Sequence, residues 1–186
     1  HFYGLDLLRG ISGYGVAICH FYAFVYQNVF LEYLSFIFVE FFFVLSGFVL
    51  FPQLLKILDN KKNLIIFYKR RWLRTLPLYF ICLVTISIMF NKLFTQDFFK
   101  YFFFLQDFFP NFLDVRYYPV VWSLSIEEFF YLLFPIFLLF SNKKNFLKNC
   151  TYLFLVLIFL KLFFVSHFDS YFLRTGTLLR FDAILL

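Results

Sequence analysis

Long apolar stretches and short polar connections alternate along the whole chain. About 20 apolar residues make a helix long enough to cross the roughly 30 Å hydrocarbon core of a bilayer. The pattern predicts about five spanning helices, at residues 5–30, 34–54, 77–90 with a backward extension through Trp72 and Leu73, 121–140 and 150–165. Lipid cannot satisfy open backbone groups, so the expected fold class is an all-α, polytopic transmembrane helix bundle.

A further apolar stretch, residues 98–109, is too short and too interrupted to span. Gln106 and Asp107 lie within it, and Pro110 follows directly. We expect this stretch to lie in the membrane interface or to re-enter the membrane. No internal repeat is visible along the chain.

The composition supports lipid as the main solvent. The chain has 63% hydrophobic and 15% charged residues, whereas soluble domains have about 45–50% and about 25%. A cleavable signal sequence is not recognisable, so we expect the first apolar segment to be retained. The chain starts at His1 and ends in an apolar run. We therefore expect residues 1–186 to be one membrane domain that is truncated at both ends.

Basic residues gather in alternate connections between the apolar segments. Residues 56–74 carry seven Lys or Arg and one acid, and residues 143–148 carry three Lys and no acid, whereas residues 27–32 have no base. By the positive-inside rule this pattern predicts a cytoplasmic N-terminus. It also accounts for the net charge of +6, so no nucleic-acid partner is expected. The three cysteines are widely spaced, and we expect neither a disulfide framework nor a metal site.

Three ionisable residues, Asp6, Arg9 and His20, lie inside the first apolar segment. Each costs about 2.5–3.5 kcal/mol at membrane depth unless it has a partner or a watery cavity. Arg9 and His20 are eleven residues apart, so a helix places them within about 20° of one face and about 16 Å apart. A guanidinium suits a phosphate, and a histidine suits a general base. Alternatively, Arg9 reaches the headgroups and pairs with Asp6, and His20 bonds a neighbouring helix.

Two adjacent acids, Glu127 and Glu128, open the fourth segment. A helix sets them 100° apart, so they cannot both face one partner. Ser123 or Ser125 could cap this helix, and one acid could favour its dipole. The chain enters the segment from outside, which predicts that both acids and Glu40 lie at a depth similar to that of His20. Together they could form a pairing network around a polar cavity.

An arginine-rich sequence leads into the third segment, with Pro77 near the expected helix start. Arg70 and Arg74 are four residues apart and face one way, whereas Arg71 faces another. These arginines suit anionic lipid headgroups, and they could also grip an anionic cytoplasmic substrate. In the second segment, Ser46 and Gly47 could form only a notch of small residues for helix packing.

Five sequence motifs occur in an order that resembles the acyltransferase 3 family of membrane-bound acyltransferases. They are Arg9 with His20, in an Arg-x10-His pattern, residues 40–48, residues 68–79, residues 122–135 and residues 180–183. The resemblance covers about the N-terminal half of the family's bundle of helices. Phe38 departs from an expected glycine and Phe129 from a common glutamine.

The resemblance implies transfer of an acyl group, often acetyl, from cytoplasmic acyl-CoA to a hydroxyl of a carbohydrate, such as a surface polysaccharide or lipopolysaccharide. Acyl-CoA would be a donor substrate, and no permanently bound cofactor is expected. By the same resemblance, His20 is the candidate base. Glu127 or Glu128 would orient His20 or the acceptor. The expected donor-phosphate residues are Arg9, Arg70, Arg71 and Arg74, and the expected supporting residues are Asp6, Glu40, Ser46, Trp122 and Ser125.

Two other classes of function remain open at this point. A transporter or flippase could use the buried charges as a substrate or proton path, although discontinuous helices and inverted repeats, which would favour it, are not visible. A non-catalytic membrane scaffold is the third class, but a scaffold has no reason to keep Arg9, His20, Glu40 and Glu127 in lipid.

Overall fold

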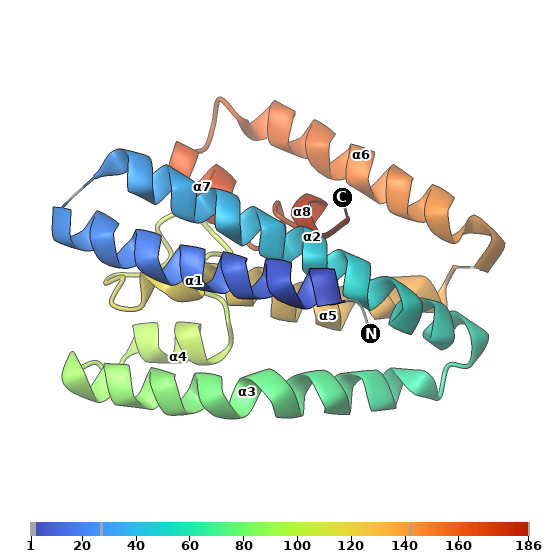
Figure 1. The fold of residues 1–186 in the computed structure, drawn as a ribbon, viewed down its shortest axis with the longest axis horizontal. Coiled ribbons are helices and arrows are strands. Elements are labelled where there is room, and N and C mark those ends of the chain that lie inside the picture. The colour runs from blue at the N-terminus through green and yellow to red at the C-terminus, as the bar shows by residue number, and fades with distance from the viewer. Residues whose placement is uncertain (1–2, 27, 142, 186) are drawn as a thin grey trace. The chain divides into compact units, whose positions relative to one another are not determined.

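The computed structural model describes residues 3–26, 28–141 and 143–185, and for residues 6, 24 and 170 it describes the backbone alone. All regular structure in these ranges is helical (Figure 1), which confirms the all-α prediction. The elements are α1 (Tyr3–Tyr26), α2 (Val29–Asp59), α3 (Asn63–Met89), α4 (Gln96–Phe102), the 3-10 turn η1 (Pro119–Val121), α5 (Trp122–Leu139), the 3-10 turn η2 (Lys143–Asn145), α6 (Phe146–Phe164), α7 (Ser170–Thr175) and α8 (Asp182–Leu185).

Among the described residues, four helical segments are long and apolar enough to cross a membrane: α2, α3, η1 with α5, and η2 with α6. Large apolar side chains project from them, including Leu73 at 75% exposure and Phe159 at 68%. In water these surfaces would be unfavourable, and in a bilayer lipid covers them. Helix α1 has 24 residues, enough for about 36 Å, but it is not among these four segments. The protein is an integral membrane protein.

The third helix is longer than its predicted span. It begins at Asn63, so the arginine-rich sequence is helical and Pro77 lies in the helix interior. The prediction that Pro77 is near the helix start was therefore wrong. Lys, Arg and Leu are good helix formers, and neighbouring groups in membrane helices compensate the hydrogen bond that a proline removes. Pro52 in α2 and Pro135 in α5 are also interior.

The stretch at residues 98–109 does not span, as predicted. Helix α4 ends at Phe102 and turns follow it. An aromatic cluster packs α4 and the segment before α5 against the second half of α3, and its buried members are Tyr79, Leu83, Phe98, Tyr101, Tyr117 and Val121. The Tyr79 hydroxyl donates to the Tyr101 carbonyl at 2.7 Å. This cluster gives α4 its tertiary support, because a helix of seven residues is marginal alone.

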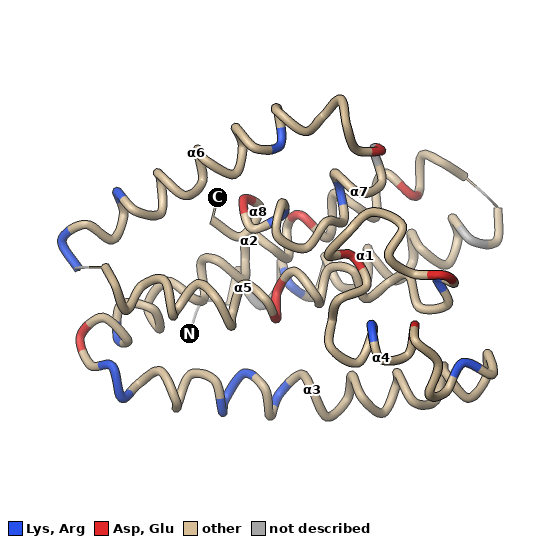
Figure 2. The backbone as a smooth tube through the Cα atoms, turned by 180° about the vertical axis from the view of Figure 1, so that it is seen from behind, with Lys and Arg blue, Asp and Glu red and all other residues tan. Residues whose placement is uncertain are grey.

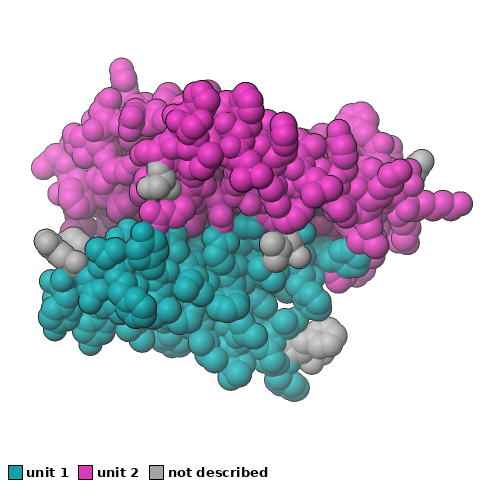
Figure 3. Space-filling model, turned by 90° about the horizontal axis from the view of Figure 1, so that it is seen from above, with its two compact units in different colours: residues 1–51, 183–186 teal, residues 52–182 magenta. Residues whose placement is uncertain are grey.

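The chain divides into two compact units, coloured separately in Figure 3. The first contains residues 1–51 and 183–186, and the second contains residues 52–182. In the first unit α1 and α2 pack together, and Gly15 faces the ring of Phe38. A Cβ at Gly15 would lie 2.7 Å from that ring, so glycine permits the close approach of the two helices.

The two basic connections meet in the second unit. Lys143 Nζ, which follows α5, lies 2.6 Å from Asp59 Oδ1 at the end of α2. This ion pair brings the α2–α3 and α5–α6 connections to the same end of the unit, where Lys and Arg gather (Figure 2). The arrangement agrees with their predicted placement on one side of the membrane.

Candidate active site

Arg9 and His20 lie on one uninterrupted helix, α1, and both are half-buried. The continuous helix supports the predicted spacing of about 16 Å on nearly one face. Asp6 lies on the same helix, but its side chain is outside the described part of the structure.

The register of α1 against α2 shows which acid is level with His20. Gly13 faces Phe42 and Gly15 faces Phe38, so the helices are antiparallel and His20 lies level with residues near Leu34. Glu32 lies close to this level on α2, and it interacts electrostatically with His20.

Glu40 is about 9 Å further along α2 than the level of His20, which differs from the predicted common depth. The difference arises because α2 begins at Val29, five residues before its predicted start. Sequence reasoning therefore missed Glu32, although the short connection before Val29 was a signal for it. By the same register, Ser46 is level with Arg9.

Gly47 has a packing role in the first unit. The carbonyl of Ile184 in α8 occupies the place where a Cβ at Gly47 would be. Any larger residue would displace this backbone. The expectation that Ser46 and Gly47 form a small-residue notch is thus supported for Gly47.

Glu128 is a buried carboxylate in the second unit, at 5% exposure. Its Oε1 accepts a hydrogen bond from Thr75 Oγ1 at 2.7 Å, across from α3. Its Oε2 is also buried and has no hydrogen-bond partner among the described residues. Arg71 lies near enough to attract the carboxylate electrostatically, and the Trp72 side chain on α3 also interacts with it. An unsatisfied buried oxygen is costly, so Glu128 differs from acids whose oxygens are all paired. Asp182 Oδ1 is a second carboxylate oxygen of this kind among the described residues.

Glu127 uses a different partner. Its Oε2 accepts from the Tyr131 hydroxyl at 2.9 Å, one helical turn further along α5. The Arg71 guanidinium stacks over the Tyr131 ring at 4.5 Å from its centre. The two acids therefore face apart, as their 100° separation predicted. Arg71 attracts the Glu128 carboxylate and also stacks on Tyr131, the partner of Glu127.

The three arginines of α3 differ in their surroundings. Arg70 and Arg74 are exposed, and Arg71 is half-buried against α5. Arg74 is adjacent to Thr75, the residue of α3 that bonds Glu128, so it points about 100° away from it. Of the three, Arg71 is the one that the structure brings to the acids.

The predicted serine caps of α5 are wrong. Helix α5 follows the 3-10 turn that starts at Pro119, and no side chain caps it. A proline fixes its own φ and lacks an N–H, so a turn that starts with it needs one cap fewer. No acid lies in the first turn of α5, which also removes the dipole interpretation for Glu127 and Glu128.

Ser125 instead belongs to a buried polar group. It is fully buried, and Gln106 Nε2 donates to both its Oγ and the Val121 carbonyl. Trp122 is buried beside this group on the same helix. Gln106 was predicted only to interrupt an apolar stretch, and its polarity within that stretch was the available signal for a buried partner.

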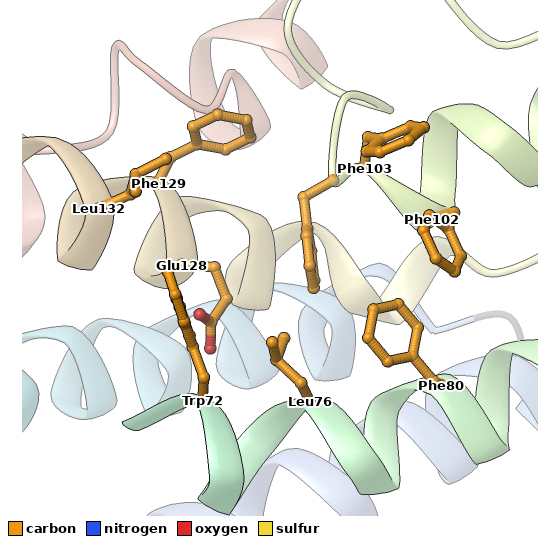
Figure 4. Close-up of a pocket in the computed structure, with 9 residues that line it drawn as sticks. Trp72, Leu76, Phe80, Phe102, Phe103, Glu128, Phe129 and Leu132 are labelled. Atoms are coloured by element: carbon orange, nitrogen blue, oxygen red, sulfur yellow. The ribbon is translucent and has the colours of Figure 1, made fainter. Parts of the chain in front are cut away.

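A cavity of about 240 Å³ lies between α3, α5 and the residues after α4. Figure 4 shows Glu128 reaching toward Trp72 and Leu76 on the opposite wall. The lining is otherwise apolar, and mostly aromatic: Trp72, Leu76, Phe80, Phe102, Phe103, Phe104, Phe129 and Leu132. Phe104 contributes its ring from a left-handed backbone conformation, with φ of 60°. Such a conformation costs energy in a bulky residue and persists only where the surroundings enforce it.

Two buried aspartates lie in the connection between α3 and α5. Asp97 Oδ1 accepts from Lys100 Nζ and the Asp114 N–H, both at 3.1 Å, and Oδ2 accepts from the Val115 N–H at 2.8 Å. Burial alone would raise the pKa of Asp97, but these hydrogen bonds outweigh it and hold the pKa below its ordinary value.

Asp107 is paired with an arginine. Its Oδ1 lies 2.5 Å from Arg116 Nη1, and the guanidinium stacks on Tyr171 at 4.4 Å. Burial raises the pKa of Asp107 above its ordinary value, and the hydrogen bond from Arg116 opposes this rise. The sequence had indicated Asp107 only as an interruption of an apolar stretch.

Asp182 belongs to the last motif of the chain. Its Oδ2 accepts from Lys161 Nζ of α6 at 2.5 Å. The neighbouring Phe181 ring meets Phe130 of α5 edge-on, with centres 5.4 Å apart. These contacts fix the motif against two helices of the second unit. Within the described ranges, no group of three or more His, Cys, Asp or Glu is placed to hold a metal ion.

Comparisons with known proteins agree with the sequence motifs. A family model described as an acyltransferase domain matches residues 2–181. The O-acetyltransferase OatA proteins of Staphylococcus aureus strains COL, MRSA252 and N315 are each 35% identical to this chain over 210 aligned residues. The alignment covers 98% of this chain, which spans about a third (33%) of the length of these relatives. No solved structure matches the chain.

Proposed function

The chain belongs to the acyltransferase domain family, and we propose that it is part of a membrane O-acetyltransferase that uses acyl-CoA as donor and a carbohydrate hydroxyl as acceptor. The observation that carries this proposal is Glu128. It is a buried acid with one unsatisfied oxygen at the wall of a cavity, and structural burial alone does not explain it. The names of the OatA relatives support the acetyl group and the oxygen acceptor.

Arginine is the residue proposed to bind the donor phosphates. Its planar guanidinium matches phosphate oxygens with two parallel hydrogen bonds. Arg71 is placed beside Glu128, and Arg9 is half-buried on α1. We assign both to the donor. Arg70 and Arg74 are exposed, and we assign them to anionic lipid headgroups.

His20 is the proposed general base. It takes the proton of the acceptor hydroxyl, whose oxygen then attacks the thioester carbonyl of the donor. The carbon–sulfur bond breaks, the acyl group stays on the acceptor oxygen, and the thiolate of coenzyme A leaves and takes up a proton. Glu32 would stabilise the imidazolium that forms, since it already interacts with His20. Transfer in this scheme is direct, without an acyl-enzyme intermediate.

Inside-out vesicles that contain the full-length protein test the reaction. They receive acetyl-labelled coenzyme A, and label on the glycan is the expected result. Glycan movement without label would instead indicate a transporter. We expect His20→Ala to abolish labelling while membrane insertion stays intact. His167→Ala is the matched control, because His167 is an exposed histidine after α6. Turnover in His20→Ala would remove His20 as the base.

The basic end of the second unit is proposed to face the cytoplasm of a bacterium, with the protein in its inner membrane. A single thiol introduced as Lys61→Cys, in a background without the native cysteines, tests this orientation. An impermeant maleimide should label it in inside-out vesicles and not in intact cells. The reverse labelling would invert the topology and move the donor site to the other face.

A further inference from the structure

The cavity beside Glu128 follows one side of α3. Trp72, Leu76 and Phe80 line it, and their spacing of four residues places them on successive turns of one helix face. This stripe starts at Trp72, next to Arg71 in the sequence, and ends about 12 Å further along the helix axis. The cavity therefore extends along α3, and Arg71, which comes directly before Trp72, is not among its lining residues.

The lining of the cavity limits what can occupy it. Its walls are aromatic and aliphatic apart from Glu128, so they favour methylene groups over hydroxyls. Glu128 Oε2 is buried without a hydrogen-bond partner in the described part of the chain, and only an N–H or O–H donor can satisfy it. An apolar chain that carries a hydrogen-bond donor along its length would fit these walls and would also satisfy the Glu128 oxygen.

We propose that this cavity binds the pantetheine arm of the donor, with an amide N–H of the arm donating to Glu128 Oε2. This inference rests on the proposed function, which supplies acyl-CoA as the donor. The arm is a chain of methylene groups interrupted by amides, so it matches both the apolar walls and the one acceptor. A lipid tail would leave Glu128 unsatisfied, and a sugar would place many hydroxyls against aromatic rings. Arg71 then holds a phosphate at the start of the arm.

Two probes separate the arm from the nucleotide. Coenzyme A carries both, whereas 3′-phospho-ADP carries the phosphates and no arm. Leu76→Trp fills the cavity, and Leu78→Trp is the matched control because Leu78 is exposed at 66% on the same helix. In the purified full-length protein we expect Leu76→Trp to weaken coenzyme A binding by about tenfold or more, because a blocked arm forfeits its buried contacts. Its affinity for 3′-phospho-ADP should stay the same.

Two further variants keep the test decisive if Leu76→Trp does not fold. Glu128→Met removes the acceptor at similar length and should weaken only coenzyme A. Arg71→Gln should weaken both probes, since both carry phosphates. Unchanged coenzyme A affinity in both Leu76→Trp and Glu128→Met would overturn the arm assignment and leave the proposed function standing. Equal weakening of both probes by Leu76→Trp would also overturn it. Failure of the wild-type protein to bind either probe would overturn the proposed function itself.

Discussion

The second unit holds two kinds of buried acid. Asp97 in the α3–α5 connection accepts hydrogen bonds at both oxygens, from a lysine and two backbone N–H groups, and Asp107 in the same connection is paired with Arg116. Glu128 on α5 has one bonded oxygen and one that has no partner among the described residues. All three are at most 5% exposed, so burial does not distinguish them.

The difference lies in how completely each acid is satisfied. A buried carboxylate with its own partners stabilises a connection, because its charge is compensated within the fold. A buried carboxylate with a free acceptor keeps a cost that a ligand can remove. Asp97 and Asp107 are thus expected to act on stability, and Glu128 on binding and turnover.

The largest expected effect on stability comes from Arg116→Ala. This change leaves Asp107 buried without its partner, which costs about 3–5 kcal/mol. The unfolding midpoint of the purified full-length protein, or the yield of folded protein, measures it. Arg116→Lys is the control, since it keeps the charge and loses the flat stacking on Tyr171. An unchanged unfolding midpoint in Arg116→Ala would show that the pairing of Asp107 does not contribute to stability.

Asp97→Asn is expected to have a smaller, pH-dependent effect. The folded-state pKa of Asp97 is depressed, so its contribution to stability is present above the unfolded pKa and is lost as pH falls through the folded pKa. At pH 7 we expect a loss of about 2–3 kcal/mol from the charged hydrogen bonds. The difference in the free energy of unfolding between wild type and variant should become smaller below about pH 4.

Unfolding curves at neutral and acidic pH measure this narrowing. Asp114→Asn is the control, because the Asp114 side chain is 76% exposed and lies 3.8 Å from the same lysine. Exposed pairs contribute about 0–1 kcal/mol, so this variant should show little change at either pH. A gap for Asp97→Asn that is constant with pH would contradict the ionised state of Asp97.

The smallest expected effect belongs to Lys161→Met. It breaks the ion pair with Asp182 and should cost about 1–2 kcal/mol, because Asp182 loses a hydrogen-bond donor. Adding Asp182→Asn to this variant should restore part of the loss, and a double-mutant cycle measures the coupling. Additive losses would show that Lys161 and Asp182 act independently.

Much of the fold was predictable because bilayer thickness dictates segment length. The apolar pattern predicted the segments that became α2, α3, α5 and α6, and the polar interruption at Gln106 predicted that residues 98–109 do not span. The start of α3 was missed because Lys and Arg were interpreted as a loop. Those residues orient a membrane helix and also propagate it, so charge alone did not locate the boundary.

The candidate site was predictable as residues and not as contacts. Glu127 and Glu128 stood out because charges in apolar segments are costly, and their divergence followed from helix geometry. Thr75, the partner of Glu128, is 53 residues away in the chain, and no local pattern pairs the two. Glu32 lies level with His20 because of the register of α1 against α2. That register is seen where Gly13 and Gly15 face phenylalanine rings, and no local sequence pattern shows it.

Acetyl transfer per folded molecule, measured for Glu128→Met beside Asp97→Asn in the full-length protein, tests most directly whether the half-satisfied acid at the cavity wall marks the site. We expect Glu128→Met to lower kcat/KM for acetyl-CoA by about 10- to 100-fold, the value of one charged hydrogen bond, with an unfolding midpoint close to wild type. Asp97→Asn should lower the midpoint and keep the activity of the folded molecules. Wild-type turnover in Glu128→Met would contradict the assignment of Glu128 to the active site.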